Sequence, residues 1–265
     1  MKLKFFVICL LSINMAACFN SAQETETNKL KEQKQAAADA VDFKKAALLN
    51  VEMGEAYLAQ GQVTRAKQKF LHALELKPKL PEAHTSIGYF YETVGDLVEA
   101  EQHYREAISL GDRKGRFYNN YGTFLCRQQR FKEADKAFNN AIKDKQYTNT
   151  AEVYENAGVC ALKQPDIDRA SKYFETAIKR DPNRYMASLE LAHIEFNKHN
   201  FLLAKEYLER YKAQVSPNAR SLLLTIRLNK ELGNKNEMAS AIMQLKNMFP
   251  KSTEYKEYIE SVRHG

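Results

Sequence analysis

Residues 81–114 read PEAHTSIGYFYETVGDLVEAEQHYREAISLGDRK, and four positions in this stretch decide the fold: Gly88, Ala100, Tyr104 and Ala107. Matching residues return every 34 positions along the chain, with one interval of 36. They are Gly54, Gly122, Gly158, Ala192 and Ile226 for the glycine; Ala66, Ala134, Ala170, Ala204 and Met238 for the first alanine; Phe70, Phe138, Phe174, Leu208 and Ile242 for the tyrosine; and Ala73, Ala141, Ala177, Tyr211 and Leu245 for the second alanine. Such a period indicates stacked repeats that bury their apolar faces against one another.

Each repeat has the pattern of a helical hairpin. A glycine in the first helix permits close approach of the second, and the alanine fills the crossing point. The aromatic residue four positions later lies on the same helical face. This pattern resembles the tetratricopeptide repeat (TPR). We therefore expect an all-α, right-handed superhelical solenoid of six TPR hairpins near residues 47–80, 81–114, 115–150, 151–184, 185–218 and 219–252, followed by a capping helix within 253–265.

Two extra residues fall between Gly122 and Gly158, and we assign them to the stretch 144–150. They predict either a longer loop between hairpins or a change in the local superhelical angle. The spacing does not decide between these two interpretations.

The N-terminus has the layout of a secretory signal. Lys2 and Lys4 precede an apolar run over residues 5–11, and the sequence Met-Ala-Ala-Cys follows at residues 15–18. This run resembles a bacterial lipobox, which implies a signal peptide over 1–17, acyl chains such as palmitate on Cys18, and a tether over 18–35 before the solenoid domain at 36–265. Phe19 stands where Asp would imply inner-membrane retention, so we expect a lipid-anchored outer-membrane protein facing the periplasm. A plain cleaved signal with a free Cys18 is the alternative.

Composition and motifs argue against catalysis. Lys and Arg exceed Asp and Glu by 40 to 33, but this excess is spread along the chain and forms no basic stripe typical of nucleic-acid binding. Phosphate-binding glycine loops, a G-x-S-x-G elbow and a zinc-protease motif are missing from the sequence. We therefore expect a monomeric binding protein that is not an enzyme and that uses no cofactor, metal or nucleic acid.

Two cysteines remain after signal removal and lipidation. Cys126 and Cys160 are 34 residues apart, late in the first helices of neighbouring hairpins, where stacked helices touch. In an oxidising compartment this spacing predicts a disulfide. Two buried free thiols are the alternative.

A more specific resemblance lies in the third repeat. The run NNYGTFLC at residues 119–126, together with the frame of Gly54, Tyr57 and Gly61, resembles the type IV pilus pilotin or stability lipoproteins, the PilF/PilW family. This family implies a six-TPR outer-membrane lipoprotein that helps the pilus secretin reach the outer membrane and multimerise, or that stabilises the assembled pilus. It implies no enzyme activity. A general envelope scaffold for peptidoglycan or lipopolysaccharide machinery is the alternative.

The geometry of the TPR family also suggests where a partner binds. In that geometry the first helix of each hairpin lines the concave groove, which would receive a segment of the secretin or of another pilus-assembly protein. We expect an exposed apolar strip at the N-terminal end, flanked by polar residues that orient the segment. The expected contacts are Leu48, Val51, Leu58 and Tyr89 in the strip, and Asn119 and Arg127 beside it. Alternatively, a helix over 36–45 folds back over the strip.

Overall fold

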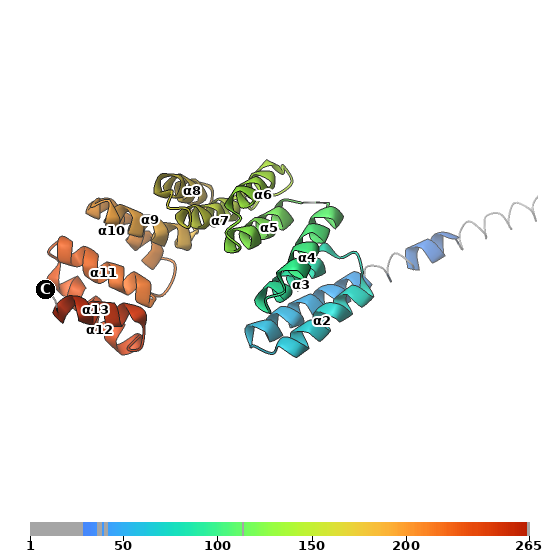
Figure 1. The fold of residues 1–265 in the computed structure, drawn as a ribbon, viewed down its shortest axis with the longest axis horizontal. Coiled ribbons are helices and arrows are strands. Elements are labelled where there is room, and N and C mark those ends of the chain that lie inside the picture. Colours follow the sequence, from blue (N-terminus) through green and yellow to red (C-terminus); the bar gives the residue numbers. More distant parts are fainter. Residues whose placement is uncertain (1–28, 36–38, 40–41, 113, 264–265) are drawn as a thin grey trace, which may run out of the picture. The chain divides into compact units, whose positions relative to one another are not determined.

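Figure 1 shows the computed structural model, which describes residues 29–35, 39, 42–112 and 114–263. All regular elements in these residues are helices, as the repeat pattern predicted. Among these residues, no helix has the length and apolar character needed to cross a bilayer. The chain divides into two compact units, Met1–Leu110 and Gly111–Gly265.

The first unit contains two hairpins. A helix over residues 42–59 precedes α2 (Val63–Leu76), and α3 (Pro81–Thr93) pairs with α4 (Leu97–Leu110). Pro81 occupies the first turn of α3, where its missing N–H costs no helical hydrogen bond. The aromatic ring of Phe70 packs against Ile87 and Phe90 of the next hairpin, which joins the two hairpins in one core.

The second unit contains four hairpins and a last helix. Its helices are α5 (Gly115–Arg127), α6 (Phe131–Lys143), α7 (Thr150–Leu162), α8 (Ile167–Arg180), α9 (Tyr185–Asn197), α10 (Phe201–Lys212), α11 (Ala219–Glu231), α12 (Lys235–Met248) and α13 (Thr253–Arg263). Each first helix contacts its own second helix and also the next first helix along the chain. The predicted capping helix is α13, which packs on α11 through Tyr255 and Tyr258.

The glycine ladder has a direct steric cause. A Cβ atom on Gly54, Gly122 or Gly158 would lie 2.5, 2.8 or 2.7 Å from the nearest ring atom of Phe70, Phe138 or Phe174, respectively. Each aromatic ring therefore occupies the space of the missing side chain within its own hairpin. The ring of Phe70 also packs on the next hairpin, so one side chain fills space both within and between hairpins.

The two extra residues form a longer loop. Residues 144–149 separate α6 from α7, whereas residues 181–184 separate α8 from α9. Tyr147 in this loop lies against the start of α5, where a Cβ on Gly115 would be 2.4 Å from the Cβ of Tyr147. Asp144 accepts a hydrogen bond from the Gly115 N–H at 2.7 Å. The loop thus folds back onto α5.

Candidate functional site

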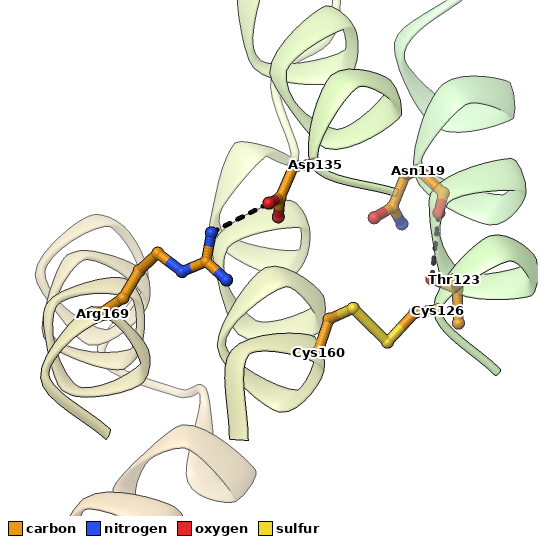
Figure 2. Close-up of a disulfide and its surroundings, with 6 residues drawn as sticks. All are labelled: Asn119, Thr123, Cys126, Asp135, Cys160 and Arg169. Atoms are coloured by element: carbon orange, nitrogen blue, oxygen red, sulfur yellow. Dashed lines mark hydrogen bonds and ion pairs between the residues drawn. A yellow bond between two sulfur atoms is a disulfide. The ribbon is translucent and has the colours of Figure 1, made fainter. Parts of the chain in front are cut away.

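A disulfide ties the junction between the first two hairpins of the second unit. Cys126 of α5 and Cys160 of α7 form a disulfide, with an S–S distance of 2.21 Å and a Cα–Cα distance of 5.8 Å. Figure 2 shows this bridge between the two first helices. Both cysteines are buried, and the Cα separation meets the limit of roughly 7 Å that disulfide geometry imposes.

Asn119 belongs to the same junction. Its side chain is only 1% exposed, it donates to Glu152 at 3.3 Å, and it accepts a hydrogen bond from Asn156 at 3.1 Å. The prediction that Asn119 orients a partner requires an accessible side chain, and it is wrong because this side chain is buried. Its amide is used to join α5 to α7, because first helices stack on each other along this face.

The predicted apolar strip in the first unit is also largely core. Val51 is 6% exposed and lies in a cluster with Ala47, Ala73, Leu80 and Ala83. Leu48 is half-buried against the same cluster, and Leu58 is half-buried against the cluster around Phe70. The expectation of an exposed strip is thus wrong for Val51, whereas Leu48 and Leu58 are partly covered. The next hairpin covers the positions that a single hairpin would leave open.

Two predicted contacts do reach the surface. Tyr89 on α3 is 50% exposed, and Arg127 at the end of α5 is exposed. Tyr89 belongs to the first unit and Arg127 to the second. Cys18 lies outside the described residues, as does most of the stretch over 36–41. Residues 42–45 are exposed in the structure.

Sequence reasoning missed a ladder of ion pairs between successive first helices of the second unit. Glu155 of α7 accepts from Arg184 at 2.5 Å and from the backbone N–H of Ala187 at 3.1 Å. One hairpin further, Glu190 of α9 pairs with Arg220 of α11 through two contacts. The signal was available in principle, because the members of each pair are separated by nearly one repeat length.

His193 lies within this ladder on α9. Burial, followed by the nearby Arg220, lowers the pKa of His193 from 6.5 to about 4. Its Nε2 atom is buried and has no hydrogen-bond partner among the described residues. The imidazole is therefore neutral at physiological pH, and this face presents paired charges around an uncharged ring.

Metal-ligating side chains do not gather in large groups. Within the part of the chain that the structure describes, no three or more His, Cys, Asp or Glu side chains are arranged to hold a metal ion. The geometry present is that of a stacked helical scaffold with exposed side chains on its faces, which suits the binding of a protein segment.

Comparisons with known proteins identify a matching family model and similar proteins. The tetratricopeptide repeat family model matches residues 51–118 and 161–219. The type IV pilus assembly protein PilF of Pseudomonas aeruginosa is 31% identical over 260 residues, which cover 97% of this chain and 98% of that protein. A second relative, an uncharacterized protein of Haemophilus influenzae, is 29% identical over 56% of this chain and 82% of its own length.

Solved structures agree with the sequence relatives. The structure of P. aeruginosa PilF superposes with a TM-score of 0.71 at 31% identity, covering 83% of this chain and 99% of that one. PilW, described as a widely conserved type IV pilus biogenesis factor, gives a TM-score of 0.68 at 25% identity and covers 80% and 98%. The nearly full-length match to PilF, with the same hairpin architecture, shows that this chain belongs to the PilF/PilW family of TPR proteins of type IV pilus biogenesis.

Proposed function

We propose that this protein is a pilotin, a non-catalytic lipoprotein that brings the type IV pilus secretin to the outer membrane and promotes its multimerisation. The observation that carries the proposal is the identity of 31% to a type IV pilus assembly protein over 97% of the chain. The described part of the chain from residue 42 onward is a scaffold of stacked hairpins, whose exposed faces suit protein binding.

The lipid anchor is the second component of the proposal. Cys18 follows two alanines after a basic and then apolar segment, so acylation of this cysteine would hold the mature protein at the membrane. One acyl chain alone binds a bilayer only marginally, whereas several chains anchor it stably. In this proposal the lipid anchor determines where the protein is located, and the hairpins bind the partner.

Tyr89 is the surface residue that we assign to partner contact in the first unit. An exposed tyrosine contributes a large apolar ring with a polar tip, which is typical of residues that dominate protein interfaces. Val98 on α4, the second helix of the same hairpin, is 69% exposed and provides a matched control on the other helix.

Gene deletion in the native host tests the proposal. Heat-resistant secretin multimers and twitching motility should both be lost, and restored by the intact gene. In the Cys18→Ser variant, the secretin should fail to reach the outer membrane. Tyr89→Ala should reduce the multimers, whereas Val98→Ala should not. Normal multimers in the deletion strain would refute the pilotin role, and missing pili beside normal multimers would assign the protein to pilus stabilisation.

A further inference from the structure

Two histidines face each other inside the second hairpin of the first unit. His84 of α3 and His103 of α4 approach with 3.0 Å between their Nδ1 atoms, and their ring centroids are 5.1 Å apart. Both side chains are half-buried. Tyr91 stacks on the His103 ring at 5.6 Å with an interplanar angle of 14°, which holds that ring in place.

The tautomer of His84 follows from its second contact. Its Nε2 atom lies 3.1 Å from the carbonyl oxygen of Pro78. A carbonyl oxygen can only accept, so Nε2 carries the hydrogen and donates it. In the neutral ring, Nδ1 of His84 therefore presents a lone pair to Nδ1 of His103.

The His103 ring can face this lone pair in either of two neutral tautomers. With its hydrogen on Nδ1, it donates to His84 and the pair is satisfied without any ligand. With its hydrogen on Nε2, two lone pairs face each other and repel unless a cation lies between them. A shift of one proton within the His103 ring thus converts a hydrogen-bonded pair into a chelating pair.

The spacing suits a transition-metal ion. Zinc binds histidine nitrogen at about 2.0–2.1 Å, so two nitrogens on a tetrahedral ion are about 3.3 Å apart. The observed 3.0 Å needs only a small widening. Ligating histidines also characteristically donate their other N–H to a backbone carbonyl or carboxylate, as His84 does to Pro78. We propose that His84 and His103 form a binding site for one divalent transition-metal ion of the zinc or copper class.

Because no group of three ligating side chains exists among the described residues, water would complete the site. Glu106 lies three residues after His103 on α4, on the same side of the helix, and is exposed. Residues three apart on a helix are neighbours, so the Glu106 carboxylate is the nearest acidic group on α4 after His103.

The bound ion would link α3 and α4 to the loop after α2, through the hydrogen bond from His84 to Pro78. This inference does not depend on the pilotin proposal.

Calorimetric titration of the full chain with zinc chloride tests the site. The protein is purified without a histidine tag, stripped of metal, and treated to block free thiols. His103→Gln is compared with His72→Gln, a matched control, because His72 is an exposed histidine that contacts Glu75 at 2.9 Å on α2. We expect one zinc ion per chain, at least tenfold weaker binding in His103→Gln, and unchanged binding in His72→Gln. Equal binding by wild type and His103→Gln, or no binding by wild type, would overturn the proposal.

A second measurement does not depend on how the variants fold. Electron paramagnetic resonance of wild-type protein with one equivalent of Cu²⁺ reports the nitrogens bound to the metal. Two imidazole nitrogens are expected. A spectrum with one nitrogen or none would show that the two rings are only a hydrogen-bonded pair.

Discussion

Asp135 of α6 and Arg169 of α8 are 34 residues apart and form an ion pair, with 2.8 Å between Oδ2 and Nη1 (Figure 2). This pair joins the second helices of two neighbouring hairpins, while the disulfide joins their first helices. The two hairpins are thus linked both through their first helices, by the disulfide, and through their second helices, by the ion pair. Their junction also contains the longer loop over residues 144–149.

Removing the disulfide should therefore weaken this junction without unfolding it. Closing a loop of 34 residues stabilises a protein by about 3–4 kcal/mol in the chain-entropy model. We expect the double variant Cys126→Ser, Cys160→Ser to lose about that much free energy of unfolding in urea titrations, while circular dichroism shows native helix content. An unchanged unfolding midpoint would mean that the bond contributes nothing beyond the contacts of Asp135 and Asn119.

Filling a glycine of the ladder should be costly. A Cβ on Gly122 would lie 2.8 Å from the ring of Phe138, so Gly122→Ala must displace the ring or the helix, and should destabilise by about 1–3 kcal/mol. The double variant Gly122→Ala, Phe138→Leu removes the ring and should lose less than the sum of its two single changes. Thermal unfolding of all four proteins measures this coupling. Strict additivity would contradict direct contact.

Some of this architecture could be predicted from the sequence because it is periodic. Gly54 and Phe70 recur at fixed positions, so the hairpins and their number follow from spacing alone. The burial of Val51 could not be predicted in this way. Its place on a first helix is compatible both with an open groove and with contact to the next hairpin, and the stacking distance between hairpins decides which is realised.

Side-chain contacts between repeats are even harder to predict from the sequence. Asn119 was recognised as distinctive, but its polar character suited a partner contact as well as the buried amide bonds that it makes. His84 and His103 are 19 residues apart and form no motif, so only the packing of α3 on α4 brings them together.

Backbone strain offers a stabilising change. Gln129 has φ of 60° in the turn between α5 and α6, at the repeat position where Gly61 and Gly95 have φ of 72° and 86°. A residue with a Cβ is disfavoured there by about 1–2 kcal/mol, and glycine is not. After the extra backbone entropy of glycine in the unfolded chain, Gln129→Gly should still gain about 0.5–1 kcal/mol.

Its neighbour provides the control for that substitution. Gln128 has φ of −81° at the end of α5, where a glycine only adds flexibility. Gln128→Gly should therefore lose about 0.5–1 kcal/mol. Urea unfolding of both variants shows whether each substitution raises or lowers the free energy of unfolding. A loss of stability in Gln129→Gly would mean that the Gln129 side chain contributes more than its backbone strain costs.

The buried His193 should make the protein less stable in mild acid. Its pKa is lowered to about 4, first by burial and then by Arg220. Between pH 6.5 and about 4 the unfolded chain binds a proton at this ring that the folded chain does not. The stabilisation is therefore complete above pH 6.5 and falls as the pH drops, by at most about 3 kcal/mol. Glu190 and Arg227 also act on this ring, and Glu190 opposes the effect.

Urea unfolding at pH 7.5 and pH 4.5 measures this loss in wild type, His193→Gln and the control His72→Gln. The difference between the two pH values should shrink in His193→Gln and stay unchanged in His72→Gln, whose ring is exposed on α2. A smaller dependence should persist in His193→Gln, because burial and His84 also lower the pKa of His103. If wild type and His193→Gln lose equal stability in acid, the imidazole takes up its proton in the folded state, and the face between α9 and α11 is open to water.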